Sequence, residues 1–177
     1  MSDDTTDVDE TLAKAVKLVE LALRRWPEQY KRMVRWRVRL DGPSLDADLL
    51  RDEFYAFFLA AFHLADWIKR DDTVDQTVRD AAWKLRHAGT LALAADVANG
   101  FKHLKLTPGR GKAAHVSVYG TFPVEEPELP QAEAAQTQPQ WLGVVVVDQE
   151  PEDAYEVADR CVAEWDTFLR QHGLNAE

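Results

Sequence analysis

The stretch FYAFFLAAFHLADWIKR, Phe54–Arg70, decides the fold of this chain. In its first fifteen residues only His63 and Asp66 are clearly polar, so a helix built from them is apolar on almost every side. A helix of that kind is normally surrounded by other protein elements. We therefore expect a central helix that begins at residue 45 or 52 and ends near Lys69.

Other segments show the apolar spacing of helices, at every third or fourth residue. For the helix after the central one, Asp71, Asp72 or Thr73 is the expected N-cap, and Gln76 completes a capping box with Thr73. Together with the central helix, these segments predict a bundle of four or five helices. The further helices are expected over residues 7–25, 73–88, 90–104 and 151–171.

Alternation of apolar and charged residues predicts strands as well. Arginines alternate with apolar residues over Val34–Leu40, and valines gather in Val116–Thr121 and Gly143–Val147. We expect these three strands to form one small antiparallel sheet, so the fold class is mainly α with an α+β insertion. Residues 123–140 are rich in Pro, Glu, Gln and Ala and contain no aromatic residue, which predicts a flexible loop over 122–140.

Length and charge limit the classes of protein that remain. The 177 residues fit a single domain, residues 1–177. A formal net charge of -10 argues against broad, sequence-blind binding to nucleic acid or to an anionic membrane. A single cysteine and an acidic N-terminus without a signal-peptide pattern predict a cytoplasmic protein that does not enter a membrane. No cofactor motif is recognisable, and we expect no cofactor.

The second apolar helix, residues 91–104, also carries a row of polar residues. Asp96, Asn99 and His103 are three and four residues apart and share one face, with Lys102 to the side. A buried polar group without a partner costs roughly 1–3 kcal/mol. We therefore expect this row to face the pair His63 and Asp66, with all of these polar groups in one cluster.

Three interpretations of this cluster are open. It can be a hydrogen-bonded core network that fixes helix register in a non-enzymatic interaction or regulatory protein. It can be an acid–base or nuclease site, because a histidine beside a carboxylate transfers protons near neutral pH. It can also be a metal site for zinc, manganese or iron in a helical bundle. The candidate catalytic residues are His63, Asp66, Asp96, Asn99, Lys102 and His103.

The sequence ANGFKH, residues 98–103, resembles the motif of HEPN-domain proteins. HEPN domains are all-helical, and many are metal-independent ribonucleases of toxin–antitoxin, abortive-infection and CRISPR systems. Their motif is an arginine, a polar residue, a short spacer and a histidine. Here Asn99 matches the polar position and His103 the histidine, while Ala98 stands in the place of the arginine.

The resemblance implies a bacterial protein linked to RNA cleavage or defence. In active HEPN proteins the arginine and histidine act together on the RNA backbone, usually across a dimer interface, which implies a possible homodimer. With Ala98 at the arginine position, the resemblance implies altered or lost catalysis unless Lys102, Arg86 or Arg79 supplies the cation.

A second candidate surface is the basic alternating segment. Arg35, Arg37 and Arg39 recur on one side of the predicted strand, with aromatic residues nearby in the sequence. Cations beside aromatic rings are what single-stranded RNA or an acidic protein partner would use. The structural alternative is a solvated strand face whose arginines pair with the chain's own carboxylates.

Overall fold

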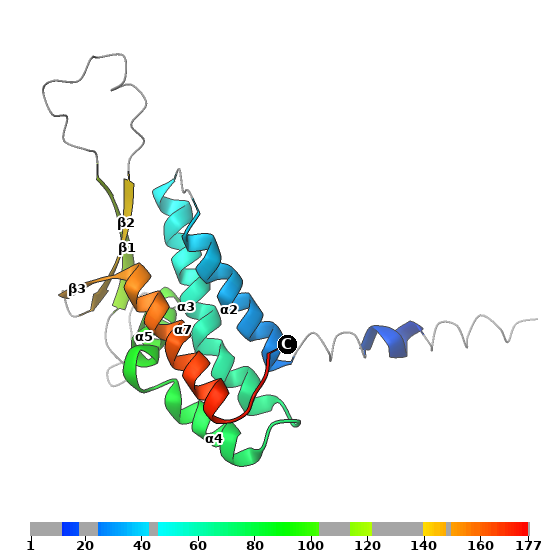
Figure 1. Ribbon diagram of the computed structural model, residues 1–177. Coiled ribbons are helices and arrows are strands. Elements are labelled where there is room, and N and C mark those ends of the chain that lie inside the picture. Colours follow the sequence, from blue (N-terminus) through cyan, green and yellow to red (C-terminus); the bar gives the residue numbers. More distant parts are fainter. Residues whose placement is uncertain are drawn as a thin grey trace, which may run out of the picture.

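The computed structural model describes residues 12–17, 25–42, 46–102, 114–121, 140–147 and 150–176. Within these parts the protein is mainly helical and carries one small antiparallel sheet, which confirms the predicted fold class. Figure 1 shows the helices that follow residue 25 gathered in one bundle, with the sheet next to them. Residues 12–17 are helical, but the rest of the first predicted helix up to residue 24 lies outside the described residues.

The bundle is built from helices that the sequence predicts, apart from α2. α3 lies at its centre, and the other bundle helices pack against it. Their bounds are α2 (Trp26–Leu40), α3 (Ala47–Arg70), α4 (Gln76–Leu85), α5 (Gly89–Lys102) and α7 (Ala154–Gln171).

The aromatic side of α3 forms the core. Phe54, Phe57 and Phe58 are fully buried, because this helix is covered on several sides. Trp165 of α7 donates its indole N–H to the carbonyl of Ala61 at 3.0 Å. The hydrogen bond satisfies a polar group inside the core and fixes α7 against α3.

Carboxylates cap the N-termini of α4 and α5, and neither carboxylate was predicted to do so. Asp75, rather than Asp71, Asp72 or Thr73, is the N-cap of α4. At the start of α5, the carboxylate of Glu164 on α7 accepts the backbone N–H groups of Thr90 and Leu91. A cap supplied from another helix cannot be predicted from the local sequence. This cap also connects α5 to α7.

The segment Val34–Leu40 is helical, so its prediction as a strand was wrong. Pro27 stands near the start of α2, where its missing N–H costs nothing, and does not disturb the helix. The residues that α2 buries are spaced three, four and seven apart, while Val38 is 64% exposed. Packing against α3 therefore favours the helical period of about 3.6 residues over the strand period of about two residues. The buried residues of α2 are Trp26, Gln29, Met33 and Leu40.

The sheet contains the two predicted valine-rich strands and one that was not predicted. β1 (Ala114–Thr121) pairs antiparallel with β2 (Gln140–Val147), which pairs antiparallel with β3 (Glu150–Asp153). The third strand is thus a short acidic segment directly before α7, where the sequence predicted the first turn of the last helix. The loop predicted over 122–140 lies outside the described residues, except for its last residue in β2.

Two glycines let the sheet lie close to the bundle. A Cβ atom on Gly143 of β2 would lie 2.2 Å from Cε2 of the Phe54 ring. A Cβ atom on Gly100 of α5 would lie 2.4 Å from the carbonyl oxygen of Ala114 in β1. Both positions need a residue without a side chain, because the neighbouring atoms belong to the core or to the backbone. None of the described helices is long and apolar enough to cross a membrane.

Candidate functional site

His63 and Asp66 contact each other on consecutive turns of α3. Nδ1 of His63 lies 2.8 Å from Oδ2 of Asp66, and both side chains are partly exposed. An ionised carboxylate only accepts hydrogen bonds, so Nδ1 carries the proton of this bond. In the neutral ring, Nε2 is then the nitrogen with the basic lone pair. This is the arrangement of a general base that a carboxylate orients.

Arg86, which follows the last residue of α4, is joined to the same carboxylate. Its Nη1 donates to Oδ1 of Asp66 at 2.9 Å, so one oxygen of Asp66 serves the histidine and the other serves the arginine. The guanidinium carbon also lies 3.3 Å from the ring centroid of Trp83 and 4.9 Å from that of Phe62. Two aromatic rings and a carboxylate therefore fix the position of Arg86.

The charges around Asp66 keep it ionised. Burial alone would raise the pKa of its carboxyl, but the hydrogen bond from His63 and the charge of Arg86 outweigh burial. The charges of His63 and Arg70 act in the same direction, and the pKa lies below its ordinary value. The site thus holds a carboxylate that remains negative at any pH at which a histidine base would work.

His87 extends the cluster towards α5. Its Nε2 accepts a hydrogen bond from Nε of Arg86 at 3.0 Å. Burial and the positive charge of Arg86 lower the pKa of His87, while the negative charges of Asp96 and Asp66 oppose this shift. The ring is therefore neutral at pH 7, and Asp96 is near enough to contribute to its electrostatics.

Ala98, which the resemblance alone places at the arginine position of the motif, is fully buried on α5. It packs with Ala95 and Phe62 in a small apolar cluster. The Phe62 ring that forms this cluster is the ring under the guanidinium of Arg86. Arg86, whose side chain is 11% exposed, consequently places a cation against the same ring, although the arginine position of the motif has none.

The structure brings together only part of the predicted cluster. His63 and Asp66 are in contact, and Asp96 lies close enough to influence His87. Asn99 is partly buried on α5. The side chain of Lys102 and all of His103 lie outside the described residues, so the predicted meeting of His63 with His103 stays a prediction.

Two members of the cluster, Trp83 and His87, were not among the predicted site residues, and Arg86 was named only as a substitute cation. The available signal was the spacing of Trp83 and Arg86, three residues apart, which places them on one side of a helix end. Sequence periodicity could not show that the turn after α4 brings Arg86 to Asp66, because that contact depends on how α4 packs against α3.

Two of the three arginines predicted to bind RNA or an acidic partner form ion pairs within the protein. Arg37 donates to both carboxylate oxygens of Asp159 on α7, at 2.6 and 3.0 Å. Arg39 pairs with the buried carboxylate of Glu53, and Arg35 is exposed. The predicted strand face is thus a helix surface that connects α2 to its neighbours, and its binding of RNA or an acidic partner stays a prediction.

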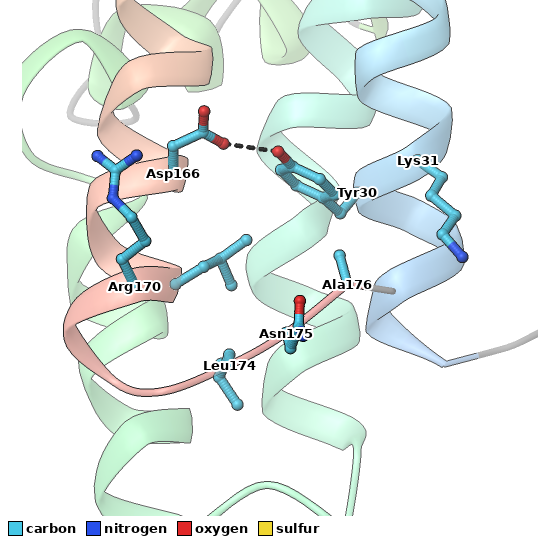
Figure 2. A pocket seen from close by; sticks show the side chains of 8 residues that line it. Tyr30, Lys31, Asp166, Arg170, Leu174, Asn175 and Ala176 are labelled. Carbon is cyan, nitrogen blue, oxygen red and sulfur yellow. Dashed lines mark hydrogen bonds between the residues drawn. The ribbon is translucent and has the colours of Figure 1, made fainter.

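A cavity of about 450 Å³ lies between α2, α7 and the residues that follow α7, and its lining does not include His63, Asp66 or Arg86. Figure 2 shows Tyr30 of α2 and Asp166 of α7 joined across its upper side, with a hydrogen bond of 2.7 Å from the tyrosine hydroxyl. Of the predicted site residues whose side chains the structure describes, none lines this cavity. Among the described residues there is also no group of three or more His, Cys, Asp or Glu side chains that could hold a metal ion.

No protein-family model, curated protein or solved structure matches the chain. The chemistry that a function can use therefore lies in one cluster, here called the His63 site. Its members are Phe62, His63, Asp66, Trp83, Arg86 and His87.

We expect the contribution of Asp66 to stability to depend on pH. A group whose pKa is lower in the folded than in the unfolded state stabilises the fold above the unfolded pKa and loses this effect as the pH falls through the folded pKa. Asp66→Asn should therefore reduce the free energy of unfolding at pH 7, with a smaller difference from wild type as the pH falls below the ordinary value of 3.8. Urea unfolding between pH 7 and pH 3 measures this; a difference that stays constant would contradict it.

Proposed function

We propose that the protein is a HEPN-like ribonuclease that cleaves RNA without a metal ion at the His63 site. The observation that carries the proposal is the shared carboxylate: Asp66 orients the imidazole of His63 through one oxygen and holds the guanidinium of Arg86 through the other. A base and a cation beside each other are two groups that assist cleavage of an RNA phosphodiester.

In this proposal His63 is the general base. Nε2 of His63 takes the proton of a ribose 2′-hydroxyl, and the 2′-oxygen attacks the adjacent phosphorus. The bond between phosphorus and the 5′-oxygen breaks, and the leaving oxygen takes a proton from an acid or from water. The products are a 2′,3′-cyclic phosphate and a 5′-hydroxyl. Asp66 stabilises the protonated imidazole that forms.

Arg86 supplies the positive charge for the phosphate. A guanidinium has five N–H donors, and the hydrogen bonds to Asp66 and His87 use two of them. The remaining donors can bind the phosphate oxygens, whose negative charge increases in the transition state. Arg86 thereby takes the role that the HEPN motif gives to the arginine at the position of Ala98.

The proposal predicts cleavage that depends on the 2′-hydroxyl and not on a metal ion. Purified protein should cut a single-stranded RNA in the presence of EDTA and leave a 2′,3′-cyclic phosphate end. DNA of the same sequence should stay intact because it lacks the attacking hydroxyl. Gel analysis of end-labelled oligonucleotides measures both results. Equal cutting of RNA and DNA, or cutting that EDTA abolishes, would contradict the mechanism.

A further inference from the structure

Trp83 is a tryptophan whose ring is both exposed and held in place. Its side chain on α4 is 39% exposed, which sets it apart from the buried Trp26 and Trp165. The guanidinium of Arg86 lies over one face of the indole, 3.3 Å from the ring centroid. Solvent therefore reaches the indole on surface that the guanidinium does not cover.

The orientation of this indole is fixed by the rest of the His63 site. Arg86 cannot turn freely, because Asp66 and His87 bind its N–H groups and its guanidinium carbon lies 4.9 Å from the ring centroid of Phe62. The indole that stacks on this guanidinium shares that restraint. An aromatic surface that is already ordered costs little further entropy when a planar group stacks on it.

In RNA, the planar group of each nucleotide is its nucleobase, which the ribose joins to the phosphate. Aromatic side chains bind single-stranded nucleic acid by stacking with bases, because every base has a π-face. Bases inside a duplex are covered on both faces by their neighbours, so they are not available for such a contact.

We propose, on the basis of the ribonuclease function above, that Trp83 stacks with the base of a nucleotide whose phosphate is bound at Arg86. The substrate is then a single-stranded RNA in which this base is unstacked. Arg86 belongs to both parts of the site: its N–H groups face the phosphate, and its plane supports the indole on which the base lies. Trp83 determines substrate class, while His63 acts on the reacting atoms.

The test separates base stacking from cleavage. The probe is a fluorescently labelled 2′-O-methyl oligouridylate, which cannot be cleaved through a 2′-hydroxyl, together with the same oligonucleotide made abasic throughout. Fluorescence anisotropy gives the Kd of each. Trp83→Leu keeps an apolar side chain without a π-face and should bind the oligouridylate about tenfold more weakly, with little change for the abasic probe. Trp83→Phe should restore most of the affinity.

Each outcome has a defined meaning. Weaker binding of Trp83→Leu to the base-containing probe alone supports stacking. Equal affinity of wild type and Trp83→Leu for the oligouridylate, in a protein that does cleave RNA, overturns the inference and leaves the ribonuclease proposal standing. Equal losses for both probes also overturn it, since a base is then not what Trp83 contacts. Failure of wild type to bind either probe overturns both proposals.

Discussion

His63→Asn is expected to slow RNA cleavage by a factor of roughly 10² to 10⁴, the usual contribution of a general base. Asparagine places an amide N–H near the position of Nδ1–H, so it can keep the hydrogen bond to Asp66 that the histidine makes at 2.8 Å. It has no basic nitrogen in place of Nε2. The change should therefore remove the proton acceptor with little loss of folded protein.

The initial rate of cleavage of a labelled RNA measures this, with circular dichroism to verify the fold. His115→Ala is the matched control, because His115 is an exposed histidine on β1 outside the His63 site. The control should cleave at the wild-type rate. A His63→Asn variant that is folded and equally fast would show that His63 is not the base.

Gly143→Val is expected to destabilise the fold by about 3 kcal/mol, at the upper end of the usual cost of overpacking a core. Its Cβ atom would lie 2.2 and 2.5 Å from two carbons of the Phe54 ring. That ring cannot move aside, because it is buried and packs edge-on to Tyr155 with a centroid distance of 4.9 Å. Urea unfolding of the variant measures the loss.

A second substitution tests the cause. If contact with the ring destabilises Gly143→Val, then Phe54→Leu should cost less in that variant than in wild type, and the double-mutant cycle should show the difference. Gly173→Ala is the control: no atom lies within 4 Å of the added Cβ, and only the left-handed backbone with φ +63 opposes it. It should cost about 1 kcal/mol. Additive costs in the cycle would exclude the ring contact as the cause.

The sequence predicts the bundle and two of three strands because their signals are local. Burial in the core is favourable for the apolar side chains of Phe54–Arg70 and for the valines of β1 and β2. In Val34–Leu40 the alternation of arginines is equally clear but has a different origin. Arg37 and Arg39 pair with Asp159 and Glu53 on neighbouring helices, and these long-range partners are invisible in a local pattern.

Of the His63 site, likewise, the sequence predicts the local contact and not the long-range one. The contact of His63 with Asp66 follows from their spacing on a helix, and the structure contains it. The contact of Asp66 with Arg86 joins residues twenty apart and depends on the turn after α4. No helical or strand period connects such residues. The identity of the cation at this site therefore required the tertiary structure.

The pairing of β1 with β2 has a consequence for engineering. Thr121 and Gln140 are paired in register, so the chain leaves the sheet and returns to it at neighbouring positions, with eighteen residues between them. The entropy of closing a loop grows only with the logarithm of its length, and doubling the length costs about 0.6 kcal/mol. A fluorescent protein whose own termini are adjacent should therefore be accepted between these two residues.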